Sequence, residues 1–203
     1  YVREELSFNS MYKQKDNIYR LHMTLAKEQN QMINVPNAVG PALKDEVTGV
    51  EQMVRMVKID FGAIASIRAN EDNFLEKKLY LADSSLFTMF DFNFIAGNAQ
   101  TAFANKKSII LSESSKKKLF GAADAIGQRI YINQRDTVEV SAVFQDLPNN
   151  STIDCNMVIN IMDSWMGQDV YWSNASYETY VRLATNAKPF LIAQQATALI
   201  DKY

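Results

Sequence analysis

Apolar and polar positions change their spacing along the chain, and each change predicts a new element. Residues 3–17 carry apolar side chains at near-helical intervals among charged ones, which predicts a helix lying on an apolar surface. Between residues 19 and 25 apolar and polar positions alternate, which is typical of a half-buried strand. Residues 36–47 predict a loop and a short helix with Pro41 in its first turn, where a missing N–H needs no partner.

A strand candidate over residues 50–60 completes a strand, helix, strand unit. Such a unit, from about residue 18 to about residue 60, predicts a βαβ crossover that joins parallel neighbouring strands. The end of the chain repeats part of this order, with a strand candidate at 177–184 followed by a helix at 186–203. We expect the two chain ends to pack together as one α+β lobe.

The predicted C-terminal helix has recognisable start signals and an apolar stripe. Asn186 is its predicted N-cap, and Pro189 lies in its first turn. Its buried stripe is predicted to consist of Phe190, Ala193, Ala196 or Thr197, and Ile200.

The middle of the chain, about residues 65–163, alternates strand candidates with short helices and turns. Residues 132–137 predict a hairpin connection, and the polar cluster at 145–152 predicts a turn because Pro148 cannot continue a ladder. The strand candidates are 74–82, 108–111, 129–133 and 137–144. The predicted fold class is therefore α+β. A lobe of about residues 1–64 plus 164–203 contains the βαβ unit, and a smaller mixed α/β lobe, about 65–163, is inserted in it.

Residues 80–98 are rich in aromatic side chains, and Gly97 stands near the end of this segment. We expect Phe87, Phe90 and their aromatic neighbours to anchor the core of a small lobe, with Asp83 and Ser84 capping the helix that follows. The alternative is a ligand-binding aromatic box.

Composition excludes several classes of protein. The chain has 203 residues, a hydrophobic fraction of 47% and a net charge of −2, which indicates a folded globular protein and no nucleic-acid partner. Its basic cluster, Lys106, Lys107 and Lys116 to Lys118, fits one solvated helix face. No apolar run is long enough to span a bilayer, and the chain begins without a methionine, so we expect a piece excised from a longer membrane protein.

The candidate catalytic patterns are weak. Ser-x-x-Lys occurs at Ser114 and at Ser115, but the accompanying Ser-Asp-Asn and Lys-Thr-Gly elements of serine acyl enzymes are missing, which favours a helix start capped by Ser112. His22 is the only histidine and Cys155 the only cysteine, so neither a triad nor a zinc site is well supplied, and no disulfide can form within the chain. A paired-carboxylate site stays open among Asp83, Asp91, Asp146 and Asp154, although their positions favour capping and turns. No phosphate loop or dinucleotide fingerprint is present, and no cofactor or metal is expected.

Four ordered segments resemble the MacB-like periplasmic core domain of FtsX-type ABC transporter permeases, especially those of Bacteroidetes. They are the opening that ends in "IYRL", the aromatic element "LADSSLFTMFDFNFIAGN", the segment "SIILSESSKKKLFGAADAIGQRI", and "VSAVFQDLPNNSTID" followed by "SYETYVRL". Ala125 stands where that family often has proline, and Ala142 where glycine is common. The residues that match the family's pattern, all expected to be structural, are Tyr19, Arg20, Asp83, Phe87, Phe90, Gly97, Leu119, Phe120, Gly121, Ile126, Gly127, Asp146, Pro148, Ser151 and Tyr180.

The resemblance implies a porter-like lobe from the chain ends and an inserted Sabre-like lobe. It also implies a non-enzymatic domain on the periplasmic side of the inner membrane that transmits ATP-driven conformational change in export or efflux. Its implied partners are an ABC ATPase, fused or separate, a second permease copy, and a periplasmic adaptor or substrate protein. A hydrophobic helix is expected before Tyr1 and three more after Tyr203, and the isolated domain is expected to be a monomer. The alternatives are an extracytoplasmic sensor or small-molecule-binding domain, which needs an apolar pocket with a few polar groups, and an extracytoplasmic hydrolase.

Overall fold

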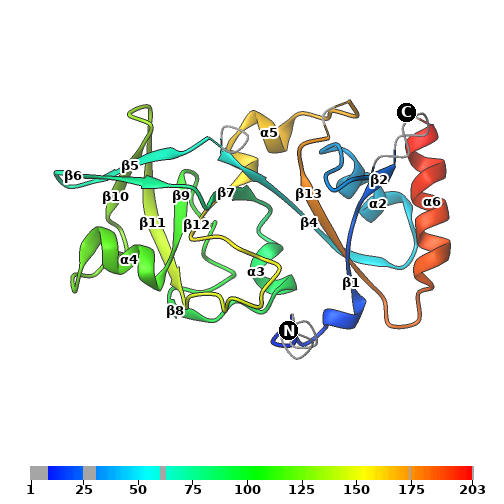
Figure 1. Ribbon diagram of the computed structural model, residues 1–203, viewed down its shortest axis with the longest axis horizontal. Helices are drawn as coiled ribbons and strands as arrows, with labels where there is room; N and C mark the ends of the chain where they lie inside the picture. Colours follow the sequence, from blue (N-terminus) through cyan, green and yellow to red (C-terminus); the bar gives the residue numbers. More distant parts are fainter. Residues whose placement is uncertain (1–8, 25–30, 60–62, 174, 203) are drawn as a thin grey trace.

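A long mixed β-sheet runs through the whole molecule in the computed structural model, which describes residues 9–24, 31–59, 63–173 and 175–202 (Figure 1). The strand order is β1-β13-β4-β7-β12-β9-β11-β10-β5-β6, and β8 pairs with one end of β11. The strands are β1 (Ile18–Arg20), β4 (Val50–Lys58), β5 (Ala65–Ala69), β6 (Asp72–Glu76), β7 (Leu79–Ala82), β8 (Phe94–Ala96), β9 (Ser108–Ser112), β10 (Arg129–Ile132), β11 (Asp136–Phe144), β12 (Met157–Asn160) and β13 (Glu178–Leu183), with a separate pair, β2 (Met23–Thr24) and β3 (Gln31–Met32). The α+β fold class is confirmed.

The helical elements are few and short. They are η1 (Lys15–Asn17), α2 (Val39–Glu46), α3 (Leu86–Met89), α4 (Glu113–Phe120), η3 (Ile161–Asp163), α5 (Trp165–Gln168) and α6 (Pro189–Asp201). Among the described residues, no helix combines the length and the apolarity that crossing a membrane requires.

The predicted βαβ unit is present but does not join neighbours. Strands β1 and β4 both pair antiparallel with β13, so they run parallel to each other with β13 between them. The crossover through α2 therefore links next-nearest strands, and the expectation of adjacent parallel strands was wrong. The local pattern cannot reveal this insertion, because the intervening strand comes from the other end of the chain.

The two faces of the sheet carry different cores. One face presents alternate residues such as Val54, Tyr80 and Phe144 to the aromatic segment around α3. The opposite face is covered by α2 and α6 over β4 and β13, by the η3 and α5 segment over β4 and β7, and by Leu119 of α4 at the far end (Figure 1). This alternation follows from the two-residue period of a strand, which sends successive side chains to opposite faces.

The helix predicted over residues 3–17 is not formed as predicted: residues 3–8 lie outside the described residues, and of the rest only Lys15–Asn17 are helical, as the short 3-10 helix η1. Residues 9–14 form turns rather than a helix, and they are held by contacts distant in sequence. The N–H of Asn9 donates to the Asn150 carbonyl at 2.9 Å, and the Tyr12 hydroxyl is hydrogen-bonded to the Ser151 hydroxyl. These long-range bonds replace the local ladder that a helix would need.

Two strand predictions were too long. The segment predicted over residues 19–25 divides into β1 and β2, because the chain leaves β13 after Arg20 to pair with β3. The segment predicted over 74–82 divides into β6 and β7, since the Glu76 carboxylate accepts the Lys78 N–H at 2.7 Å and turns the chain. Strands β3, β5, β8 and β12 were missed.

Several local predictions agree with the structure. Strand β4 and helix α2 lie where the pattern placed them, and residues 132–137 form the β10 to β11 hairpin with positive φ at Asn133 and Gln134. Ser112 caps α4 through its side chain, which accepts from the Ser115 N–H. The segment from Pro148 to Ser151 closes a turn by a backbone hydrogen bond of 3.0 Å.

Helix α6 differs from its prediction in both cap and stripe. Pro189 is its first residue, but the N-cap position is Lys188 rather than Asn186, and no side chain caps it. Its buried residues are Ile192 and Leu199. Of the predicted stripe, Ala196 and Ile200 pack partly against the same core, whereas Phe190 is 72% exposed. The helix is rotated relative to the predicted stripe because the apolar surface of α2, β4 and β13 decides which of its faces is covered.

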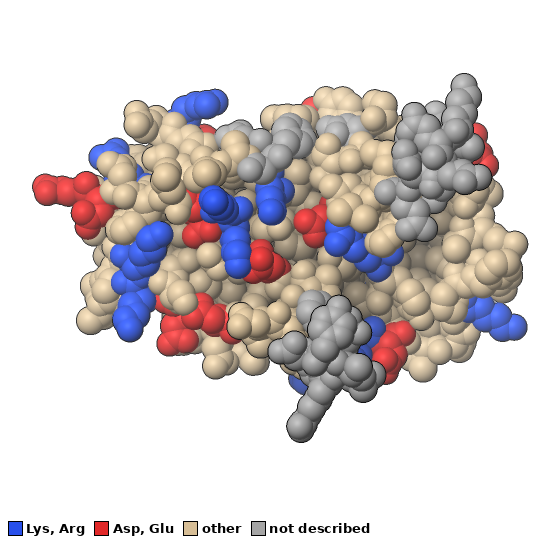
Figure 2. All heavy atoms as spheres, viewed as in Figure 1, with Lys and Arg blue, Asp and Glu red and all other residues tan. Residues whose placement is uncertain are grey.

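Charged side chains are dispersed over the face of the molecule that Figure 2 shows. In the face shown in Figure 2, lysine and arginine side chains alternate with acidic ones, and no extended basic stripe is seen. This distribution agrees with a net charge of −2 and offers no electrostatic footprint for a nucleic acid on that face.

Candidate functional site

A buried ion pair lies where β4 meets β7. The Arg55 Nε and Nη2 donate to the two Asp83 carboxylate oxygens, each at 2.9 Å, and the backbone N–H of Arg55 donates to Asp83 Oδ2 at 2.8 Å. The two side chains are only 5% and 10% exposed. In this water-poor position the bidentate geometry satisfies both charges and fixes the two strands against each other.

Further groups hold the arginine from the opposite side. Its Nη1 donates to the carbonyls of Asn37 and Gly167, at 3.5 and 3.4 Å. Asn37 is itself fully buried and donates from Nδ2 to the carbonyls of Met166 and Asp169. The pair thereby connects β4, β7, the turn before α2, and α5. It also lies at the floor of a groove of about 530 Å³ between α2 and residues 162–172.

Sequence reasoning missed Arg55 and misread Asp83. Asp83 does not cap α3, because its carboxylate is occupied by Arg55, and the N-cap position belongs to Ser85, which makes no side-chain cap. The available signal was an arginine inside the apolar strand "VEQMVRMVK". A buried arginine requires a partner, so its presence there predicts an acid nearby in space, but it does not identify which acid.

Four of the predicted residues meet around Tyr12. The Tyr12 ring packs edge to face on Phe90 at 5.1 Å between centroids, and Phe90 packs in the same manner on Tyr180 at 5.2 Å. The Arg20 guanidinium lies over the Tyr180 ring at 5.7 Å, and Ser151 meets the Tyr12 hydroxyl. Burial, the largest effect, raises the pKa of both tyrosines. Residues from the beginning, middle and end of the chain are joined here. Tyr19, next to Arg20, points outward and is 37% exposed.

The aromatic element fills a core rather than lining a box. Phe87 is 2% exposed and contacts Phe92, Phe94 and Phe103 with ring centroids 5.2 to 5.5 Å apart. Phe92 continues the cluster to Phe144 of β11. The rings fill the space between one another, which is the core packing that the sequence predicted.

Asp146 fastens the start of α4. It accepts hydrogen bonds from the backbone N–H of Ser114, at 3.0 Å, and from the Ser114 hydroxyl. Burial acts to raise the pKa of Asp146, but the hydrogen bonds from Ser114 outweigh it and hold the pKa below its usual value. Pro148, two residues on, is exposed.

The end of α4 and the turn after it carry five more of the predicted residues, on a part of the sheet distant from β4 (Figure 1). Leu119 is buried, Phe120 packs partly against the same core, and Gly121 ends the helix with a φ of 57°. Ile126 is 40% exposed and lies in the turn before β10, which begins at Arg129. Ala125 is the buried residue of this turn, and Gly127 has a φ of 79°.

Residues 2–199 match the family described as MacB-like periplasmic core domain. The chain belongs to this family. It is accordingly a periplasmic domain of a MacB-like ABC transporter permease, a transport component and not a catalytic enzyme. No curated protein matches the chain in sequence.

Solved structures share the fold of this MacB-like domain. A domain of a permease protein from Porphyromonas gingivalis is 23% identical, with a TM-score of 0.79, and the match covers 94% of this chain and 86% of that one. The periplasmic region of MacB from Actinobacillus actinomycetemcomitans is 13% identical, with a TM-score of 0.66 and coverage of 92% and 83%. The extracellular domain of the noncanonic ABC-type transporter YknZ from Gram-positive bacteria is 17% identical, with a TM-score of 0.65 and coverage of 92% and 94%.

The weak catalytic patterns have structural uses in the MacB-like domain. The hydroxyl of Ser114 is bound to Asp146, and Ser115 is buried against Ser112. His22 is exposed, and Cys155 is buried, which raises the pKa of its thiol and keeps it protonated. Within the described ranges, no three His, Cys, Asp or Glu side chains gather closely enough to hold a metal ion.

Gly97 is tightly packed, whereas Gly127 is open, and alanine substitution should separate the two cases. Gly97 has a φ of 72°, and a Cβ there would lie 2.8 Å from Ala142 Cβ and from the Ser141 carbonyl oxygen. We expect Gly97→Ala to lower the free energy of unfolding by about 2 to 3 kcal/mol, through left-handed strain plus the clash. Gly127→Ala, with nothing within 4 Å, should cost only the backbone term, about 1 kcal/mol. Urea unfolding of both variants checks this, and equal losses would contradict it.

Proposed function

We propose that the domain is a stiff extracytoplasmic lever that transmits ATP-driven conformational change and engages a substrate or partner protein during export or efflux. The observation that carries this proposal is the unbroken hydrogen-bonded sheet from β1 to β6, locked at β4 and β7 by the buried Arg55–Asp83 pair. A displacement applied at one end of a closely packed body reaches the other end, because such cores deform little.

The seam between the two proposed lobes, residues 1–64 plus 164–203 and residues 65–163, lies at β4 and β7. Only three residue pairs align there, Met56 with Ala82, Val57 with Leu81, and Lys58 with Tyr80. Such a short ladder alone would be a weak joint. The seam is strengthened because Asp83 donates its N–H to the Arg55 carbonyl at 3.1 Å and its side chain holds the Arg55 guanidinium. We infer that the lobes move together at this joint.

The proposed partners follow from membership of an ABC transporter family. An ABC ATPase, fused or separate, would supply the driving conformational change through membrane helices that flank this domain in the full-length permease, with the domain facing the periplasm from the inner membrane. A second permease copy would provide the opposing lever. A periplasmic adaptor or substrate protein would contact the outer surface.

The test uses the full-length permease with its ATPase and measures ATP hydrolysis and export together. Arg55→Met removes the cation and loosens the seam, so we expect ATP hydrolysis to persist while export falls. The control is Asp154→Asn, which removes an ion pair with Lys78 on the surface, where the side chains are 65% and 45% exposed, and should change neither activity. Hydrogen exchange at Leu81 reports whether the seam has opened. Unchanged export with an opened seam would refute the lever.

The isolated 203-residue chain is expected to be a monomer, because the dimer contacts of the proposed assembly depend largely on membrane segments. Light scattering across a range of concentrations measures this directly. A dimer that persists on dilution would contradict this expectation, because it would mean that two copies of this domain bind each other strongly without membrane segments.

A further inference from the structure

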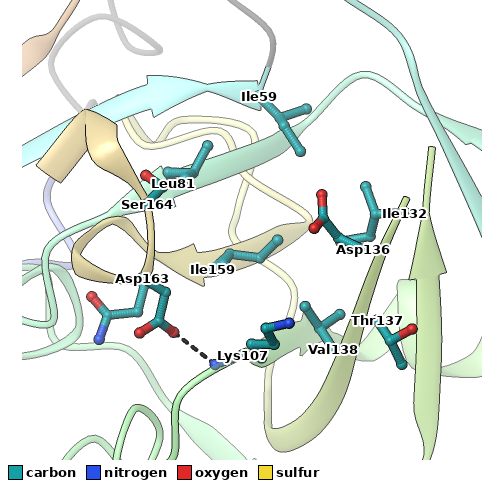
Figure 3. Close-up of a pocket in the computed structure, with 11 residues that line it drawn as sticks. Ile59, Leu81, Lys107, Ile132, Asp136, Thr137, Val138, Ile159, Asp163 and Ser164 are labelled. Carbon is teal, nitrogen blue, oxygen red and sulfur yellow. Dashed lines mark hydrogen bonds between the residues drawn. The ribbon is translucent and has the colours of Figure 1, made fainter. Parts of the chain in front are cut away.

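A small pocket opens on the sheet face opposite the aromatic core. Its floor is built from aliphatic side chains of five strands or strand ends: Ile59, Leu81, Ile132, Val138 and Ile159 (Figure 3). No residue of α4 lines it, and the η3 segment supplies only part of its rim. At this pocket, the apolar surface of this sheet face is therefore open to solvent.

Two opposite charges stand at the rim of the pocket. Figure 3 shows the Lys107 ammonium beside Val138 and the Asp136 carboxylate between Ile59 and Ile132. Neither side chain forms an ion pair or hydrogen bond with another described residue. The third charged rim group, Asp163, is occupied, because its Oδ2 accepts the backbone N–H of Lys107 at 2.8 Å. Lys107 and Asp136 thus remain available to a ligand, and Asp163 adds a second negative charge to the rim.

The backbone of Lys107 is held in an uncommon conformation. Its φ is 59°, which a lysine rarely adopts, and its N–H and carbonyl are fixed by Asp163 and by the N–H of Glu139, the latter at 2.9 Å. Strain of this kind persists only where surrounding contacts impose it, and it is concentrated at functional positions. The two hydrogen bonds that impose this conformation also fix the position of the Lys107 Cα, from which its side chain extends.

We propose that this pocket binds a free aliphatic α-amino acid. The carboxylate of the ligand would meet Lys107, its ammonium would meet Asp136, and its side chain would occupy the floor over Leu81 and Ile159. The volume of about 140 Å³ agrees with this class. Pockets for drug-sized ligands hold about 300 to 1,000 Å³, so this pocket is too small to enclose a ligand of that size. The inference goes beyond the lever function, because it adds a ligand that the transport proposal does not require.

The experiment titrates the 203-residue chain with L-leucine and follows amide shifts by two-dimensional NMR. We expect saturable shifts at residues 107, 136–138 and 159–164. Leucinamide, which lacks the carboxylate, and N-acetyl-L-leucine, which lacks the ammonium, should each bind about tenfold more weakly, since each loses one charge-assisted contact. Glycine, which has no side chain for the floor, should produce no saturable shifts.

Matched variants assign the two charges. Lys107→Met and Asp136→Asn should each weaken L-leucine binding about tenfold, and the loss for Lys107→Met should disappear when leucinamide is the probe. Lys106→Met and Asp72→Asn, which alter exposed residues of the same types outside the pocket, should bind like the unaltered chain. The absence of saturable shifts with L-leucine would overturn the proposal. Equal binding of the doubly capped N-acetyl-leucinamide would also overturn it, because the pocket would then select only an apolar side chain.

Discussion

Replacement of Asp83 by asparagine is expected to lower the free energy of unfolding by about 3 to 5 kcal/mol, because it leaves the Arg55 cation buried without its counter-charge. Asparagine matches aspartate in size, so the loss reports charge and hydrogen bonding rather than a cavity. The Arg55 side chain is 5% exposed, and water cannot replace the missing carboxylate without opening the seam. Urea unfolding of the isolated chain, followed by circular dichroism, measures the change.

Two controls separate this effect from a general dependence on surface charge. Asp154→Asn breaks the exposed pair with Lys78 and should cost less than about 1 kcal/mol. The double variant Arg55→Met with Asp83→Leu removes both charges and should recover most of the stability lost in the single variant, because apolar residues can replace a buried pair. A loss below about 1 kcal/mol for Asp83→Asn would mean that the pair is solvated and is not the lock of the sheet.

Truncation of Phe87 to alanine is the second large effect, and we expect a loss of about 3 to 5 kcal/mol in the free energy of unfolding. Phe87 is 2% exposed and meets three other phenylalanine rings, so its removal leaves a cavity that those rings cannot readily fill. Thermal and urea unfolding measure the loss.

Phe190 is the matched control for Phe87, since it is the same residue type but 72% exposed. Phe190→Ala should change the free energy of unfolding by no more than about 0.5 kcal/mol. The reverse order of the two effects would support the apolar stripe predicted for α6 from sequence and would contradict the orientation of that helix in the structure.

Local signals in the sequence predicted those elements whose chemistry is contained in a few neighbouring residues. Ser112 caps α4, and the hairpin at 132–137 forms, because capping and tight turns depend on adjacent residues. The aromatic element was also predicted as core. Strand β12 was missed because its apolar residues continue directly into η3, so the run shows no period that marks a strand.

The candidate sites depend on residues that meet only in the fold. Asp83 read as a cap because it precedes a helix, and nothing in the sequence connects it to Arg55, 28 residues earlier. Lys107 and Asp136 read as a surface lysine and a turn residue, yet β10, β11 and the η3 segment place them around one apolar opening. Each of these pairings depends on strand order.

The sequence by itself determined the family, the α+β class, the Ser112 cap, the turns at 132–137 and 148–151, and the aromatic core, because these depend on which residue types stand near one another along the chain. Only the tertiary structure decided the insertion of β13 between β1 and β4, the covered face of α6, and the partner of Asp83. The physical reason is that apolar periodicity indicates which residues are buried, but it does not indicate which element they pack against. A buried charge likewise requires a partner, and only the folded chain selects it.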